Sequence, residues 1–152
     1  MYLRAGDTIS GQEGKATANI NGSVVDMFYL KDLEATLEKN KTEIKTLGKR
    51  GLQHKSAGWS GTGSMTLYYV TTAFRKMAVQ YAKTGKDTNF DITVVNEDPG
   101  STVGKQTVVL YNCNLDSVIL AKLDVETESL DESIDFTFDD VDILDEFGNP
   151  II

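Results

Sequence analysis

Apolar and polar residues alternate along much of this chain, and this alternation restricts its fold more than any other sequence feature. Leu33, Ala35 and Leu37 alternate with polar neighbours, for example. Successive side chains of a β-strand point to opposite faces, so a two-residue period predicts half-buried strands. The segments with this period, or with a composition typical of strands, are 15–20, 24–30, 33–38, 64–70, 90–94, 107–113, 117–125 and 134–139.

Turn-forming residues separate several of these segments. Asn21-Gly22 joins the first two, and this pair is favoured in two-residue hairpin turns because both positions need a positive φ. Asp98-Pro99-Gly100 supplies a further turn. We therefore expect a mainly β fold. The length of 152 residues predicts a single domain, with a flexible N-terminal arm at 1–13 and an acidic C-terminal tail at 141–152.

One helix is expected, from about residue 72 to residue 84. Thr71 or Thr72 provides a cap at its start, and Gly85 ends it. Val79 is an apolar residue on the polar face, either an isolated exposed side chain or a contact for a neighbouring subunit. The apolar face, which we expect to pack on a sheet, consists of Phe74, Met77, Ala78, Tyr81 and Ala82.

A basic, glycine-rich segment precedes the helix. Residues 47–63 fit neither the helical nor the strand period and hold five glycines and the only tryptophan, Trp59. With the basic residues before it, this segment predicts a long loop over residues 41–63. Long loops within one domain are uncommon and tend to be functional. Tryptophan beside basic residues is typical of protein interfaces.

Charge is distributed unevenly. All 15 Lys and Arg residues lie within residues 1–122, and residues 123–152 hold 11 of the 23 acids. Duplex affinity depends on neutralising phosphates, so this end is unsuited to nucleic-acid binding. The acids would suit a surface that repels a polyanion. A solvated, soluble face is the alternative explanation.

The residues that catalysis or metal binding would require are sparse. His54 is the sole histidine, so a catalytic triad would have to use it, and the G-x-S-x-G pattern is absent. Gly61-Thr62-Gly63 lacks the Gly-Lys-Ser/Thr ending of a phosphate loop. Cys113 is the only cysteine, which excludes an intrachain disulfide. The C-terminal acids fit a solvated strand face better than a paired catalytic site. We expect no enzymatic activity, cofactor or metal site.

The N-terminal residues lack the apolar core of a signal peptide, and no apolar run approaches the ~20 residues of a membrane span. We therefore expect synthesis in a cytoplasm and no membrane anchor.

The run from Leu47 to Gly85, LGKRGLQHKSAGWSGTGSMTLYYVTTAFRKMAVQYAKTG, resembles the central signature of the tail tube proteins of contractile phages. It is similar to the tube proteins of defective Bacillus-type prophage particles and of phage-tail-like bacteriocins. The resemblance covers roughly residues 14–146. Its most specific part is Gly58-Trp59-Ser60-Gly61-Thr62-Gly63-Ser64-Met65-Thr66, after the basic Gly-Lys-Arg segment.

The resemblance implies an antiparallel β-sandwich or barrel with a flanking helix and a long loop between subunits. It implies a structural subunit whose hexameric rings stack into a tube inside a contractile sheath, with DNA or ions passing through. The partners would be further copies, the tail sheath protein, and the baseplate and tail terminator proteins. Such a subunit would assemble in the bacterial host cytoplasm and reside in a virion tail or tail-like particle.

Candidate site residues follow from this resemblance. The long loop would reach the adjacent ring through Lys41, Lys45, Lys49, Arg50, His54, Lys55 and Trp59. We further expect a negative lumen that repels DNA, lined in part by Glu128, Asp135 and Asp139. One alternative is a small β-barrel module that binds a ligand or nucleic acid through the basic loop and Trp59. Another is a small hydrolase that uses His54.

Overall fold

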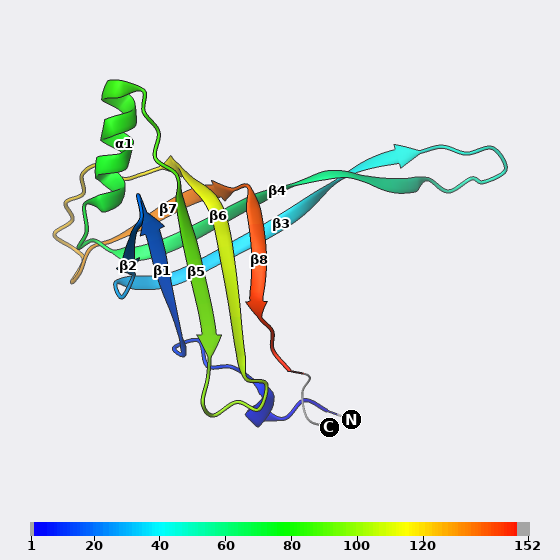
Figure 1. Cartoon of the computed structure of the whole chain (residues 1–152), viewed down its shortest axis with the longest axis horizontal. Helices are drawn as coiled ribbons and strands as arrows, with labels where there is room; N and C mark the ends of the chain where they lie inside the picture. The colour runs from blue at the N-terminus through cyan, green and yellow to red at the C-terminus, as the bar shows by residue number, and fades with distance from the viewer. Residues whose placement is uncertain (1, 149–152) are drawn as a thin grey trace.

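A computed structural model describes residues 2–148 as a mostly β protein with one α-helix (Figure 1). The predicted fold class is confirmed. A short 3-10 helix, η1 (Ala5–Asp7), precedes the first strand. The remaining elements in chain order are β1 (Gly14–Ile20), β2 (Ser23–Asp26), β3 (Leu30–Ile44), β4 (Gln53–Tyr68), α1 (Ala73–Thr84), β5 (Phe90–Glu97), β6 (Lys105–Ser117), β7 (Asp131–Phe138) and β8 (Asp140–Asp145).

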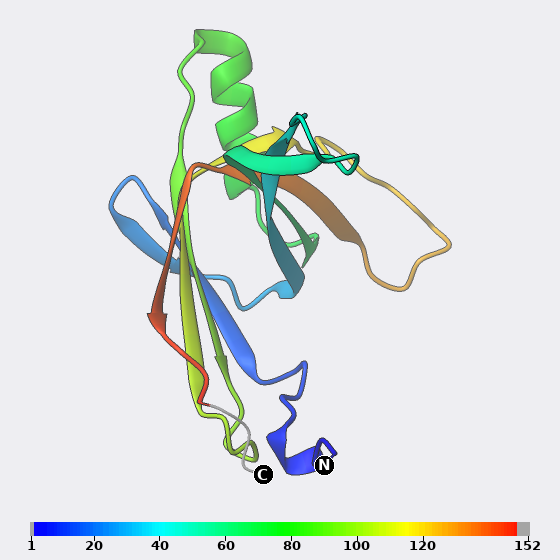
Figure 2. The same cartoon turned by 90° about the vertical axis from the view of Figure 1, so that its right-hand side faces the viewer.

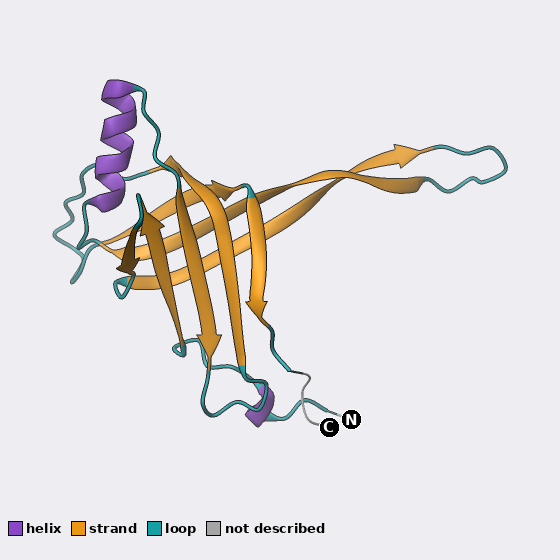
Figure 3. Ribbon diagram, in the orientation of Figure 1, coloured by secondary structure: helices purple, strands orange, loops and turns teal. Residues whose placement is uncertain are grey.

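The strands form one antiparallel path in the order β2-β1-β5-β6-β7-β4-β3, and β8 pairs with β6 beside this path. The path bends at β6. The first part of β6 pairs with β5 and β8, whereas the last residues of β6, from Asn114, pair with β7. As a result β3, β4 and β7 run across β1, β5 and β8, as Figure 3 shows. Two layers at a steep angle enclose the core.

Asn112 marks the bend in β6. It has a positive φ of 58°, and the β5–β6 register slips between the pairs Phe90–Cys113 and Ile92–Leu110. Its backbone N–H donates to Asp91 Oδ1 at 3.0 Å instead of joining the regular ladder. An extra residue of this kind bends a strand and increases its twist. The bulge therefore allows one strand to serve both layers.

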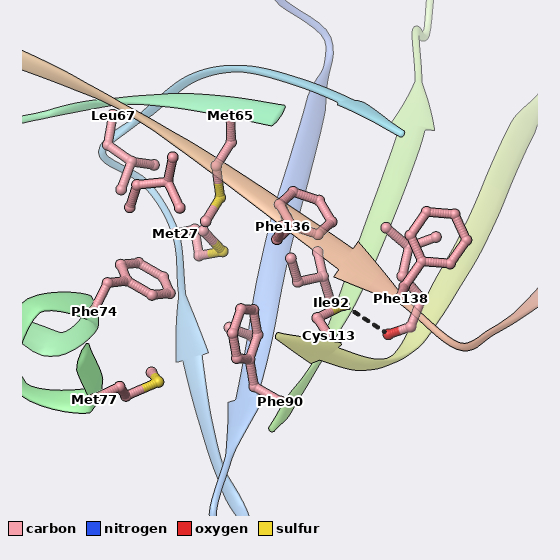
Figure 4. Close-up of a cluster of buried hydrophobic side chains, with 14 of the residues drawn as sticks. Met27, Met65, Leu67, Phe74, Met77, Phe90, Ile92, Cys113, Phe136 and Phe138 are labelled. Atoms are coloured by element: carbon pink, nitrogen blue, oxygen red, sulfur yellow. Dashed lines mark hydrogen bonds between the residues drawn. The ribbon is translucent and has the colours of Figure 1, made fainter. Parts of the chain in front are cut away.

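The core lies between the two layers and beneath the start of α1 (Figure 4). Phe74 of the helix lies 5.8 Å from Phe90 of β5, measured between ring centroids. Cys113 is fully buried and donates to the Leu110 carbonyl at 3.6 Å. The largest fully buried side chains are Phe74, Phe90, Phe136, Met65, Leu67, Ile92, Ile134, Glu132 and Cys113.

The predicted Asn-Gly hairpin is present. Asn21 and Gly22 have φ values of 53° and 83°, and Ile20 pairs with Ser23. Two consecutive positive φ values give the turn that matches the twist of the flanking strands. The partner strand ends at Asp26, earlier than the expected residue 30, and residues 27–29 turn into β3.

The helix spans Ala73–Thr84, close to the predicted range. Gly85 ends it with φ 74° and donates its N–H to the Tyr81 carbonyl at 2.9 Å. Only the first half packs on the sheet. Phe74 and Met77 are buried, whereas Tyr81 and Ala82, expected on the packed face, are exposed. Figure 2 shows the helix extending above the strands.

Several sequence boundaries differ from the structure. Residues 41–44 and 53–63 belong to β3 and β4, which shortens the expected loop over 41–63 to residues 45–52. Residues 118–125, expected as a strand, are irregular because β6 ends at Ser117. Within the expected acidic tail, residues 140–145 form β8 and pair with β6, and residues 149–152 lie outside the described residues.

The N-terminal residues are attached to the body of the protein. Asp7 is buried and accepts a hydrogen bond from the Thr102 hydroxyl. The Thr102 N–H donates to the Gly6 carbonyl at 3.0 Å. These contacts hold η1 against the turn between β5 and β6, and the flexibility expected for residues 1–13 stays a prediction.

Candidate assembly surfaces

The most prominent surface feature is a hairpin that projects beyond the body of the protein. We call residues 39–58 the hairpin arm. It consists of the ends of β3 and β4 and the connection over residues 45–52 (Figure 1). Every residue from 34 to 60 is exposed, so neither face of the arm packs on the chain's own core. A two-stranded ribbon alone is marginally stable in water, which makes a further partner for the arm physically reasonable.

The arm is strongly basic. It carries six Lys and Arg residues and a single acid, Glu43. Lys41 lies opposite Ser56, and Lys55 lies opposite Thr42. Lys45, Lys49 and Arg50 occupy the connection at the tip. Within residues 2–148 none of the six basic residues forms an ion pair.

Trp59 lies at the base of the arm and not in a free loop. It is opposite Lys39, and its ring centroid lies 6.1 Å from that of Phe138. Its exposed fraction is 39%, because one side covers Phe138 at the margin of the core. Next to it Gly58 has φ 96°, where the β3–β4 register slips. A bulge at this position adds twist as the ribbon leaves the sheet.

A second surface is the outer face of β3, β4 and β7. Glu34, Ser64 and Asp135 lie side by side across these three strands, and Thr36, Thr62 and Thr137 form the next row. A shallow hollow there is also lined by Asp116. We call this surface the acidic face and define it by Asp32, Glu34, Glu38, Asp116 and Asp135. Its opposite side contributes Met65, Ile134 and Phe136 to the core.

The three acids predicted for a lumen lie in different places. Asp135 belongs to the acidic face. Asp139 directly follows β7, and its Oδ2 accepts a hydrogen bond from Asn112 Nδ2 at 2.5 Å. Glu128 lies in the irregular segment between β6 and β7. The structure therefore does not bring the three together on one strand face.

Sequence reasoning missed Asp32, Glu34, Glu38 and Asp116. The alternation in residues 33–38 already assigned Glu34 and Glu38 to the polar side of a strand. The missing information was the pairing of that strand, through β4, with the strand that carries Asp135.

Few features of the described residues suggest catalysis. His54 is exposed on the arm, opposite Glu43. Burial raises the pKa of the Cys113 thiol to about 12, with the charge of Asp91 as a further contribution, so this thiol is a poor nucleophile. Residues 2–148 contain no group of three His, Cys, Asp or Glu side chains placed to hold a metal ion.

The helix α1 is too short to cross a bilayer, and the part of the chain that the structure describes has no other helix with the length and apolar character of a membrane span.

Comparisons with known proteins agree with the fold. The family model described as DUF2001, phage tail tube protein, matches residues 1–145. The phage-like element PBSX protein XkdM of Bacillus subtilis (strain 168) is 40% identical over 149 residues, which covers 98% of this chain and 99% of that protein.

Solved structures with lower sequence identity share the fold. A chain in the tube-terminating cap of the anti-feeding prophage has a TM-score of 0.69 at 11% identity, covering 94% of this chain and 95% of its own. A chain in the extended sheath–tube complex of the extracellular contractile injection system PVC has a TM-score of 0.66 at 11% identity, with 90% of each chain covered. The family match and the identity over nearly the whole chain show that this protein belongs to the phage tail tube protein family, the structural subunits of tails and tail-like particles.

Proposed function

We propose that copies of this chain form hexameric rings that stack into the inner tube of a contractile tail. The observation that carries this proposal is the hairpin arm, a long basic ribbon exposed on both faces and without an ion-pair partner among the described residues. A neighbouring copy would cover it. Lys41, Lys45, Lys49, Arg50, His54 and Lys55 would then contact the adjacent ring, with Trp59 at the base of the contact.

The edges of the strand path support lateral association within a ring. The path ends at β2 and at β3, and each has only one neighbour among the described strands. Every residue of β2 is exposed, including Val24. Unpaired sheet edges are sites where other strands add, and a closed ring of subunits would remove them.

The acidic face is our candidate for the lumen wall. It combines carboxylates with Ser and Thr hydroxyls, and it carries no Lys or Arg among the residues that define its hollow. A wall of this kind would repel the phosphates of passing DNA and would not retain it. The concentration of acids here supports Asp135 as a lumen residue and adds Glu34 and Asp116. Glu128 and Asp139 remain candidates outside this face.

The partners follow from the same proposal. A tube of this kind would be surrounded by a tail sheath protein and would end at baseplate and terminator proteins, with DNA only as transient cargo. The two solved structures that share the fold come from a tube-terminating cap and from a sheath–tube complex, which supports these partner classes.

Electron microscopy of the purified chain, with its mass in solution, tests the proposal. We expect rings and hollow tubes with six subunits per ring. Rings with another subunit number would correct the symmetry only. A protein that stays monomeric at high concentration, and also when the baseplate complex of its own particle is added, would contradict the proposal.

A further inference from the structure

The segment between β6 and β7 is, like the hairpin arm, an exposed surface that no other described part of the chain covers. We call residues 118–130 the acidic loop. It lies at the opposite end of the molecule's longest dimension from the hairpin arm, as Figure 1 shows, and Figure 2 shows it extending away from the strands. The two surfaces therefore face in different directions and cannot contact each other within one chain.

Apolar side chains in the acidic loop are unusually exposed. The exposed fractions are 98% for Leu123 and 95% for Val125, and Leu120 reaches 62%. Leu123 and Val125 alternate with Asp124 and Glu126, which is the period of a strand, yet β6 ends before this segment and β7 begins after it. The sequence thus has a strand-like pattern whose apolar side is uncovered in the single chain. Burial of such side chains by a partner would be favourable.

The base of the acidic loop is anchored, and its acidic part is not. Lys122 Nζ donates to the Asp131 carbonyl at 2.8 Å, and Lys31 Nζ forms an ion pair with Asp131 Oδ2 at 2.9 Å. The N–H of Glu126 donates to Asp124 Oδ1, which shapes a turn. Within the described residues Glu126 and Glu128 form no ion pair.

The tip of the hairpin arm has the complementary chemistry. Leu47 is fully exposed, Ile44 and Leu52 have exposed fractions of 42% and 44%, and Lys45, Lys49 and Arg50 lie between them. One surface thus combines apolar side chains with positive charge, and the other combines apolar side chains with negative charge. The acidic face fits the tip less well, because its hollow is lined by Ser, Thr and carboxylates with Phe136 buried beneath.

We propose that the arm tip of one copy docks on the acidic loop of a copy in the next ring. Lys49 and Arg50 would face Glu126 and Glu128, and Leu47 would pack beside Leu123 and Val125. Contact between two different ends of identical molecules, repeated in one direction, produces an open stack. This inference rests on the proposed tube function and names the surface on the next copy that receives the arm.

Engineered cysteines provide a direct test. The only native cysteine, Cys113, is fully buried, so Leu47→Cys and Leu123→Cys introduced together would supply the accessible thiols. If the tip of each copy meets the loop of the next, mild oxidation of assembled tubes should give a ladder of linked copies on a non-reducing gel. The control pairs Leu47→Cys with Ile143→Cys, because Ile143 is an equally apolar, 58% exposed residue beside acids in β8.

A charge exchange gives an independent readout. Glu126→Lys with Glu128→Lys should raise the protein concentration needed for tubes by about tenfold or more, because opposite charges become like charges. Adding Lys49→Glu and Arg50→Glu to the same chain should restore assembly toward the original concentration. Rescue is the informative result, since a merely misfolded loop would not recover.

Normal tubes with no ladder through residue 123, or a ladder through residue 143 only, would overturn the inference while leaving the tube function intact. Normal assembly of the Glu126→Lys, Glu128→Lys chain would do the same. Failure of the unmodified chain to assemble, even with the baseplate complex present, would overturn the proposed function and the inference together.

Discussion

Gly63 of β4 lies directly opposite Phe136 of β7, and the phenyl ring occupies the space that a side chain at position 63 would need. A Cβ added to Gly63 would lie 2.4 Å from Phe136 Cζ. Gly61 has the same relationship to Phe138, at 2.4 Å from Cε2. Two of the five glycines that made residues 47–63 resemble a loop, Gly61 and Gly63, are therefore required by the packing of the core.

Gly63→Ala should destabilise the subunit by about 1–3 kcal/mol, because the added methyl group forces the buried Phe136 ring to move. Urea unfolding of unassembled subunits measures this change. Gly11→Ala is the matched control, since nothing lies within 4 Å of an added Cβ there. Equal stability of the two variants would contradict the packing described at β4 and β7.

Arg75 of α1 joins the helix to the sheet through Glu132 of β7, with Nη1 and Oε2 2.8 Å apart and exposed side-chain fractions of 12% and 1%. The guanidinium also stacks on Tyr69 and donates to the Thr71 carbonyl. Arg75→Met should cost about 3–5 kcal/mol, because it leaves Glu132 charged and buried. The double change Arg75→Met, Glu132→Leu should recover most of that loss in thermal unfolding. No recovery would show that the arginine acts chiefly through its other contacts.

The ion pair between Lys31 and Asp131 is exposed and contrasts with the buried pair of Arg75 and Glu132. The ammonium group of Lys31 lowers the pKa of Asp131 through a hydrogen bond, and both side chains are substantially exposed. The folding stability that the Asp131 carboxylate contributes is therefore present above the ordinary Asp pKa. It is lost as the pH falls through the lowered pKa of Asp131 in the folded protein. Lys31→Met should move the pKa of Asp131 back up in an NMR titration, with a smaller stability change than Arg75→Met. An unchanged pKa would contradict the pairing.

Cys113 predicts a specific sensitivity to alkali. Its folded pKa is about 12, against 9.0 for an ordinary thiol, so the unfolded chain loses this proton first. Stability contributed by the neutral thiol is fully present below pH 9 and declines as the pH rises toward 12. The stability advantage of the original protein over Cys113→Ala should therefore shrink above pH 9. A difference that stays constant with pH would show that the thiol is not held neutral by burial.

The acidic face predicts how tubes treat DNA. Glu34→Gln, Asp116→Asn and Asp135→Asn together should leave assembly intact and increase the retention of short DNA by purified tubes, most strongly at low salt. Asp140→Asn, Asp142→Asn and Glu146→Gln remove the same charge from the region of β8 and should not change retention. Equal retention in all three proteins would contradict the lumen assignment, and loss of assembly would assign these acids a structural role.

His54→Ala separates the tube function from the hydrolase alternative. His54 lies on the arm opposite Glu43, and the five Lys and Arg side chains of the proposed ring contact remain in this variant, so tubes should still form. Any hydrolytic activity found in the original protein and abolished in this variant would instead favour the alternative.

Sequence patterns predicted the elements that have one face in the core. Alternation at Leu33, Met65 and Ile134 identified three strands, and Asn21-Gly22 identified the hairpin. The pattern failed in the arm, where both faces of residues 53–60 are exposed and no apolar alternation is needed. It also predicted a strand at 117–125, because Leu123 and Val125 alternate with acids, although none of the described strands pairs with residues 118–125. The candidate surfaces depended on strand pairings between distant segments, which single-sequence periodicity does not contain.

The strand order also affects how the subunit folds. Residues 53–56 of β4 pair with nearby residues 41–44 of β3, whereas residues 61–68 of the same strand pair with residues 131–138 of β7. Local hairpins form in microseconds, but pairing between segments separated by about half of the chain must first overcome a larger loss of loop entropy. The basic ribbon can therefore form early, and the surface built from β3, β4 and β7 is complete only after the C-terminal strands have been synthesised. In the proposed tube, a partly translated chain would consequently lack part of the structure needed to join a ring, and polymerisation would wait until folding is finished.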